Sequence, residues 1–147
     1  MLSAARRSIK GTSAYNKAMG ELDRAFVLLR HETSAGVHWD LMLDTGSALA
    51  TWQLGEDPTE LTRGAEADTE SIPARRLPEH RRAYLEYEGP VSGNRGQVTR
   101  VDRGTCSFVR DEPQSCVVTL AGTLLTGTFE LKVEATDSNL WRFGRAG

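Results

Sequence analysis

Two histidines and an aspartate lie close together early in the chain and could bind a metal ion. His31 and His38 flank a short glycine-containing segment, and Asp40 follows His38 at a spacing of two. Side chains two apart on a strand point to the same face, so His38 and Asp40 would project together. If His31 returned to them, two imidazoles and one carboxylate would suit Mn, Fe or Zn and leave coordination positions open. The alternative is that both histidines only hydrogen-bond to nearby backbone.

A second polar cluster follows between residues 79 and 89. His80 and Tyr84 could donate hydrogen bonds to a phosphate, or could be an exposed histidine and a half-buried aromatic residue. Every cation between residues 75 and 110 is an arginine, and acids are fewer there, although the net charge of the chain is −2. Because the guanidinium fork matches phosphate oxygens, this block favours a polyanion partner; the alternative is a solvated face.

Short strands are the elements that must position these residues. Apolar runs separated by glycine, proline and polar turns predict strands at 25–29, 38–43, 48–54, 82–88, 96–102, 104–109, 116–121, 126–133 and 139–143. The acidic segment 56–74 predicts a long loop with at most one helical turn, and 13–22 is the one helix candidate. Many short strands with turn signals between them indicate a sandwich or a small barrel.

The composition predicts one domain without a membrane span. A chain of 147 residues, 39% of them hydrophobic, suits a single core, and no apolar run reaches the length of a bilayer. Residues 1–24 begin with a basic, acid-poor stretch and are predicted to be a flexible tail before a domain at 25–147. Cys106 and Cys116 form neither a disulfide framework nor a zinc spacing, which favours a reducing, cytoplasmic compartment.

Several motifs together resemble the 3′-phosphoesterase domain of bacterial DNA ligase D. The first is Arg30-His31-Glu32 followed by His38-Trp39-Asp40-Leu41-Met42-Leu43 and a strand containing Trp52. The later ones are His80, Tyr84, and the segments 87–98, 102–105, 120–131 and 141–143. Because they occur in order over roughly residues 25–143, coincidence is a poor explanation.

This resemblance implies a compact, closed β-barrel with a polar crater for metal and phosphate and little helix. By resemblance, His31, His38 and Asp40 match manganese ligands, with Zn²⁺ or Co²⁺ as alternatives, while His80 and Tyr84 match catalytic residues that hold the substrate phosphate. Arg76 and Arg95 are further candidates for binding that phosphate.

The resemblance also implies an activity and a partner. The family removes a terminal ribonucleoside from a primer strand and then the remaining 3′-phosphate, as one step of DNA end repair. The expected partner is therefore a ribonucleotide-terminated 3′ end on a primer-template, with a separate ligase or polymerase as a further candidate.

Three positions depart from the family's pattern. Met42 stands where an arginine is usual, the segment 53–56 lacks a usual lysine, and the loop between the two histidines is slightly longer. A rival interpretation is thus a non-catalytic module that binds 3′ ends. Another is an oxygenase that uses His38 and Asp40 with His80 as a facial triad.

Overall fold

Antiparallel strands make up most of the part of the chain that the computed structural model describes, residues 23–62, 71–134 and 139–146. They are β2 (Arg24–Thr33), β3 (Gly36–Asp44), β4 (Leu49–Leu54), β5 (Ser71–His80), β6 (Gly89–Pro90), β7 (Gln97–Glu112), β8 (Ser115–Gly122), β9 (Thr126–Val133) and β10 (Trp141–Arg145). The helical elements among the described residues are two 3₁₀ turns, η2 (Pro58–Thr62) and η4 (Arg82–Leu85). The predicted all-β class with little helix is confirmed.

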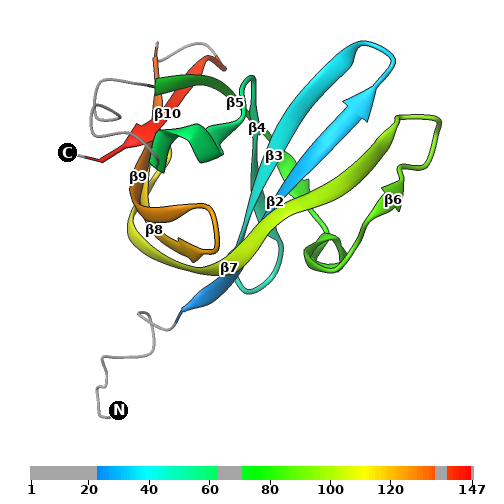
Figure 1. Cartoon of the computed structure of the whole chain (residues 1–147). Coiled ribbons are helices and arrows are strands. Elements are labelled where there is room, and N and C mark those ends of the chain that lie inside the picture. Colours follow the sequence, from blue (N-terminus) through cyan, green and yellow to red (C-terminus); the bar gives the residue numbers. More distant parts are fainter. Residues whose placement is uncertain (1–22, 63–70, 135–138, 147) are drawn as a thin grey trace.

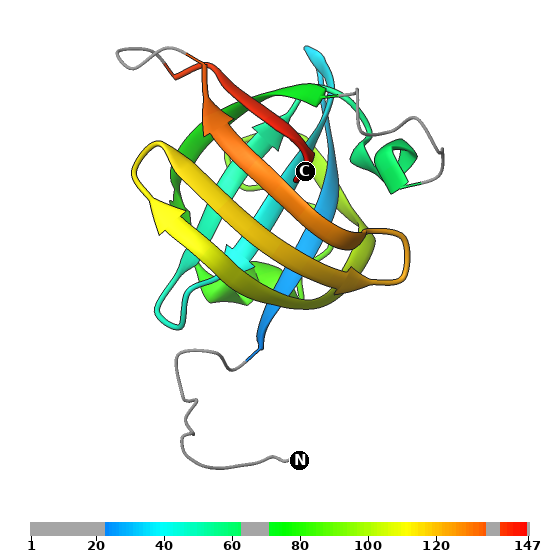
Figure 2. The same ribbon diagram turned by 90° about the vertical axis from the view of Figure 1, so that its left-hand side faces the viewer.

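The strands close into a ring. The sheet order is β2-β3-β4-β5-β10-β9-β8-β7-β6, and β2 also pairs with β7, so that eight strands form the ring and β6 attaches to β7. Figure 2 shows β7, β8, β9 and β10 curving in front of β2, β3 and β4. In Figure 1 the β2–β3 hairpin and the β6–β7 ladder extend away from strands β8, β9 and β10. No helix in the described residues is long and apolar enough to cross a membrane.

Four of the predicted elements differ from the structure. The strand expected at 82–88 is wrong, because residues 82–85 form η4, whose Tyr84 and Leu85 pack together against one apolar cluster. Strand β5 occupies residues 71–80, which include the end of the predicted loop; its Ile72 and Ala74 are buried on alternate positions. The strands expected at 96–102 and 104–109 are one long strand, β7. The helix candidate at 13–22 lies outside the described residues.

Gly104 explains why β7 runs on without a break. A Cβ at this position would lie 2.1 Å from the backbone oxygen of Ala121 on β8, so the two strands approach each other more closely than a side chain allows. Glycine is therefore a packing requirement here and not a turn signal.

Strand β2 carries apolar side chains on both faces, which explains its unbroken apolar run. Phe26 and Leu28 point into the ring and join the main core, which includes Trp52, Phe129 and Phe143. The outer face of β2 and its neighbouring strands carries a second apolar cluster, formed by Val27, Leu29, Met42, Leu49 and Val98. Strand β2 is thus buried on both of its faces.

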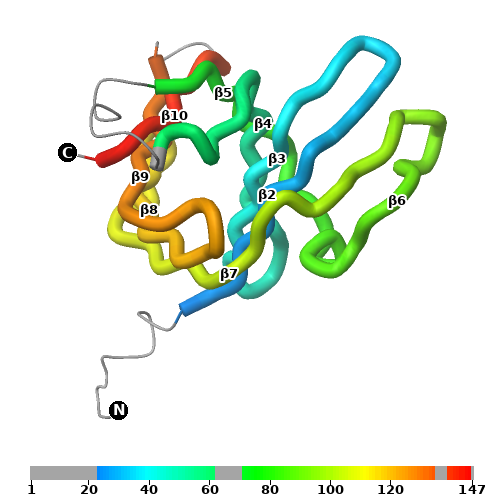
Figure 3. The backbone as a smooth tube through the Cα atoms, viewed as in Figure 1, coloured from blue at the N-terminus to red at the C-terminus, as the bar shows by residue number. Residues whose placement is uncertain are grey.

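Residues 81–96 cover the second cluster. Tyr84, Leu85 and Val91 pack against it, and η4 contacts β2. Figure 3 shows this segment leaving β5 and passing beside β2 and β7 before it reaches β6. Residues 81–96 therefore pack on the face of β3 that carries His38 and Asp40.

Candidate metal and phosphate site

The β2–β3 hairpin brings the three predicted ligands together. His31 and His38 are register partners across the two strands, and their ring centroids lie 4.6 Å apart. Asp40 lies on the same face of β3 as His38, as the strand period predicts. Potential ligand atoms of all three residues lie within 4.8 Å of one another. This group contains His31 and not His80, so it differs from the facial triad of the oxygenase interpretation.

The backbone of Arg95 fixes the tautomer of His31. The Nε2 atom of His31 lies 2.7 Å from the carbonyl oxygen of Arg95, which can only accept, so Nε2 carries the proton. In neutral His31 the remaining lone pair is on Nδ1, which lies 3.3 Å from Oδ2 of Asp40. Metal-binding histidines often donate their second ring N–H to a backbone carbonyl in this way.

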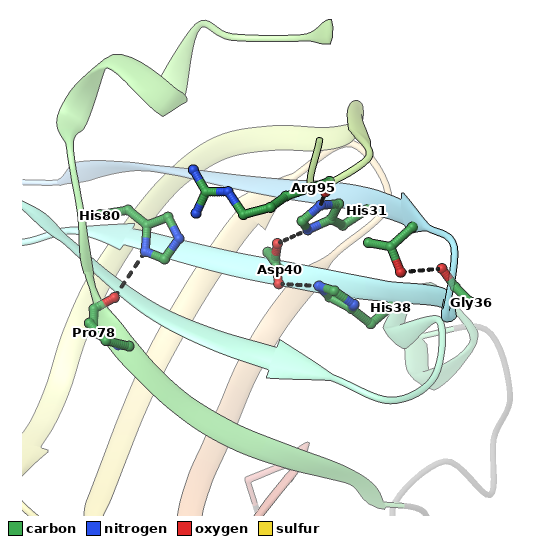
Figure 4. A network of polar contacts seen from close by, with 8 residues as sticks. His31, Gly36, His38, Asp40, Pro78, His80 and Arg95 are labelled. Atoms are coloured by element: carbon green, nitrogen blue, oxygen red, sulfur yellow. Dashed lines mark hydrogen bonds and ion pairs between the residues drawn. The ribbon is translucent and has the colours of Figure 1, made fainter. Parts of the chain in front are cut away.

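Asp40 presents its other oxygen to His38. Oδ1 lies 3.2 Å from Nε2 of His38, yet this oxygen is buried and has no hydrogen-bond partner. The carboxylate is only 3% exposed, so water does not compensate its charge. One ring nitrogen therefore faces each carboxylate oxygen, Nδ1 of His31 at Oδ2 and Nε2 of His38 at Oδ1, and Figure 4 shows both contacts of Asp40. A divalent cation among these atoms would satisfy all of them, so the residues fit a metal ion.

The turn at residues 91–96 depends on Gly96. A Cβ on this glycine, which has a φ of +86°, would lie 2.0 Å from the backbone oxygen of Glu32 on β2. The turn also closes through a 2.8 Å hydrogen bond from the amide of Val91 to the carbonyl of Gly96. This close approach holds the carbonyl of Arg95 against His31. The sequence places this turn in the family motif at residues 87–98 but indicates no such role for it.

The three candidate ligands line a pocket of about 240 Å³. Its other walls come from β3, β4, β5, η4, the turn and β7: Met42, Gln53, Leu77, His80, Tyr84, Val91, Arg95 and Val98. Of the residues predicted to bind phosphate, His80, Tyr84 and Arg95 thus share one pocket with the three candidate metal ligands, and so does Met42.

His80 is oriented by its own strand. Its Nδ1–H donates to the carbonyl of Pro78 at 2.9 Å, so Nε2 is the atom left for a ligand. Its ring meets Tyr84 edge to face with centroids 5.7 Å apart. Arg95 is held by Ser92, whose carbonyl and hydroxyl accept from Nε and a terminal nitrogen at 2.7 and 3.1 Å. Figure 4 shows the Arg95 side chain directed from the turn toward His80.

The structure does not bring Arg76 into this pocket. Its guanidinium stacks 4.3 Å from the ring centroid of Trp52, which belongs to the main core inside the ring. Leu77, the next residue of β5, lines the pocket instead. Alternation along the strand places these two side chains on opposite faces.

An ion pair that the sequence did not indicate ties η4 to the end of β3. Arg82 donates through Nε and a terminal nitrogen to the two oxygens of Asp44, at 3.0 and 2.8 Å. These bonds hold the pKa of Asp44 below its ordinary value, because they favour the ionised carboxylate. The pair fixes the segment that carries Tyr84.

The fold and the site define an all-β domain with a pocket that could bind a metal ion. The family model described as DNA Ligase D 3′-phosphoesterase domain matches residues 29–133, and the chain belongs to this family. The matched range contains every residue of the pocket. No curated protein matches the chain.

Proposed function

We propose that this chain is a divalent-metal-dependent phosphoesterase that acts on 3′ ends of nucleic acid, removing a 3′-ribonucleoside and a 3′-phosphate in end repair. The observation that carries the proposal is the convergence of three potential ligand side chains, among them Asp40 whose Oδ1 has no hydrogen-bond partner, in one pocket with His80 and Tyr84. Membership of the phosphoesterase family supports the reaction class. Mn²⁺ is the proposed ion, with Zn²⁺ or Co²⁺ as alternatives.

The metal-binding and phosphate-binding residues of the pocket have separate proposed roles. His31, His38 and Asp40 would hold the ion, which supplies Lewis-acid polarisation of a phosphoryl oxygen. His80, when protonated, donates through Nε2, since its Nδ1–H is already bound to Pro78. The hydroxyl of Tyr84 would donate a second hydrogen bond to the phosphate. Both donors would then stabilise negative charge that develops on the transferring group.

Arg95 is the proposed substitute for the arginine that the family has at the position of Met42. Met42 is only 2% exposed and packs in the second cluster, with no charge to offer. Arg95 lines the same pocket from the turn, and Ser92 binds only part of its five N–H donors. Arg76 remains a weaker candidate, since it would first have to leave the ring of Trp52.

Cleavage of end-labelled primers tests the proposal. Wild type should release a 3′-phosphate and a 3′-ribonucleoside when Mn²⁺ is present, and His80→Ala should lower the rate by at least 100-fold, as the loss of one oxyanion donor does. If wild type cleaves weakly because it lacks the family arginine, Met42→Arg should raise the cleavage rate. If Arg95 already supplies that charge, Met42→Arg should change the cleavage rate little. Absence of metal-dependent cleavage in both wild type and Met42→Arg would refute the enzyme proposal.

The second candidate is a module that binds 3′ ends without turnover. The buried thioether of Met42 favours it, because a pocket without that arginine loses transition-state stabilisation before it loses the metal. Phosphate affinity that depends on Mn²⁺, measured together with absent cleavage, would identify this candidate.

The domain bounds, the partners and the cellular compartment are also proposals. Residues 25–147 are proposed as the domain, and residues 1–24 as a basic tail that overlaps the first residue of β2. A primer-template with a ribonucleotide at its 3′ end is the proposed partner, joined by a separate ligase or polymerase, in the cytoplasm. Copurification of such an enzyme with the full chain would support this setting.

A further inference from the structure

A second cavity lies beside the metal and phosphate pocket. It has a volume of about 230 Å³ and is lined by Arg81, Ala83, Tyr84, Tyr87, Pro90 and Ser92. Tyr84 belongs to the walls of both cavities. A second connection is Ser92, which lines this cavity and binds the side chain of Arg95 in the first. The two cavities are therefore adjacent, with Tyr84 between them.

Aromatic rings lead from the first cavity into the second. His80 meets Tyr84 and Tyr84 meets Tyr87, in both cases edge to face with centroids 5.7 Å apart. The hydroxyl of Tyr87 donates to the carbonyl of Pro90, which fixes the far end of its ring. Tyr87 nevertheless remains 37% exposed. Its ring is thus a preorganised surface that nothing in the described part of the chain covers completely.

The polar groups of this cavity suit a nucleotide of any sequence. Arg81 is exposed, and no ion pair or hydrogen bond of its side chain occurs among the described residues. The carbonyl and hydroxyl of Ser92 already accept hydrogen bonds from Arg95. The cavity therefore offers aromatic rings and one cation but few free groups that could distinguish the edges of the bases. Stacking on an aromatic ring tolerates every base, because each base has a π face.

We propose that this cavity binds the terminal nucleoside whose 3′-oxygen carries the phosphate, with its base stacked on Tyr87. The inference rests on the proposed function in one respect, that the phosphate occupies the pocket of His80 and Tyr84. A cavity of about 230 Å³ is smaller than the roughly 300–1,000 Å³ of complete small-molecule sites, so it fits one nucleoside fragment and not a longer strand. Arg81 would then lie along the backbone and contribute charge without sequence readout.

Binding of small probes tests this subsite without requiring turnover. The full chain with Mn²⁺ is titrated with inorganic phosphate, with adenosine 3′-monophosphate and with the 3′-phosphate of an abasic sugar. Wild type should bind the adenosine probe about 5- to 150-fold more tightly than the abasic probe, the range expected for one stacked base. Tyr87→Ala should reduce this preference to about 1, whereas affinity for inorganic phosphate should stay unchanged.

Tyr87→Phe is the matched control. It keeps the ring and loses only the hydrogen bond to Pro90, so it should retain most of the preference for the adenosine probe. A Tyr87→Ala variant that keeps the preference would overturn the subsite, and so would a wild type that binds the adenosine and abasic probes equally.

The two proposals fail in different ways. If the enzyme proposal is wrong, cleavage is absent, but the ratio of the affinities for the adenosine and abasic probes can still be measured. Loss of the subsite appears as a flat probe ratio in a protein that still cleaves. If inorganic phosphate does not bind but the adenosine probe binds through Tyr87, the subsite stands and the phosphate pocket is wrong; if no probe binds, both are wrong.

Discussion

Replacing Asp40 with asparagine should separate the stability of the metal-free fold from its response to metal. Asp40 is 3% exposed, and its Oδ1 lacks a hydrogen-bond partner. Asparagine keeps the shape, removes the buried charge and adds an N–H₂ group that can donate to His38. A buried, unsatisfied polar group costs about 1–3 kcal/mol, so metal-free Asp40→Asn should be as stable as wild type or more stable by about that amount.

The response to metal should change in the opposite direction. At a free metal concentration of 100 times Kd, binding stabilises the native state by about 2.7 kcal/mol. Loss of a ligand should weaken affinity by at least the roughly 10- to 100-fold seen when an outer-shell partner is lost. The stabilisation at the same metal concentration then falls to about 1.4 kcal/mol or less. At roughly 4 °C per kcal/mol, the Tm shift falls from about 11 °C to under about 6 °C.

Thermal unfolding with and without Mn²⁺ measures both effects, and Asp102→Asn is the matched control. Asp102 is also buried, at 4% exposure, but it accepts the backbone N–H groups of residues 123, 124 and 125 at 2.9, 2.9 and 2.7 Å. Its variant should therefore lose stability without metal and keep the full metal-induced shift. A full metal-induced shift in Asp40→Asn would refute the reasoning, as would a loss of metal-free stability like that of the control.

Three further perturbations follow from the structure. Arg82→Ala should lower the free energy of unfolding at neutral pH, because Asp44 loses its ion pair. The pKa of the Asp44 carboxyl is lowered in the fold, so the pair stabilises the protein above the ordinary pKa, and this stabilisation disappears as pH falls through the folded value. Urea unfolding should therefore show a difference between variant and wild type that shrinks in acid. Burial raises the pKa of Cys106 and Cys116 to about 12, so both thiols should resist a thiol reagent until urea unfolds the protein, and rapid labelling of the native state would contradict this. Gly96→Ala should weaken Mn²⁺ binding by about 10- to 100-fold in calorimetry, since the added Cβ would lie 2.0 Å from a backbone oxygen of β2; unchanged affinity would show that the turn does not orient the site.

The sequence alone predicted those parts of the site that depend on local geometry. The spacing of His38 and Asp40 implied a shared face, and Met42 lies on that face as the same period requires. Residue type and clustering also made His31, His80 and Tyr84 candidates, and resemblance to the family gave them their expected metal and phosphate roles. These predictions needed only strand alternation and ordered motifs.

Contacts between distant segments could not be predicted from the sequence. Arg76 was a phosphate candidate because it lies in the basic block, but the register of β5 turns it toward Trp52. Pro73 lies in the segment 56–74 that was predicted to be a loop, although strand β5 accommodates this proline and Pro78 as well. The carbonyl of Arg95 reaches His31 only because the turn meets β2, and backbone groups carry no sequence signal.

We propose above all that one divalent ion and one phosphate share the pocket on the β2–β3 hairpin. A crystal structure of the full chain with Mn²⁺ and phosphate tests it most directly. The claim predicts a single ion coordinated by His31 Nδ1, His38 Nε2 and the Asp40 carboxylate, and a phosphate hydrogen-bonded to His80 Nε2 and the Tyr84 hydroxyl. Mn²⁺ bound away from these three side chains, or phosphate bound away from His80 and Tyr84, would contradict it.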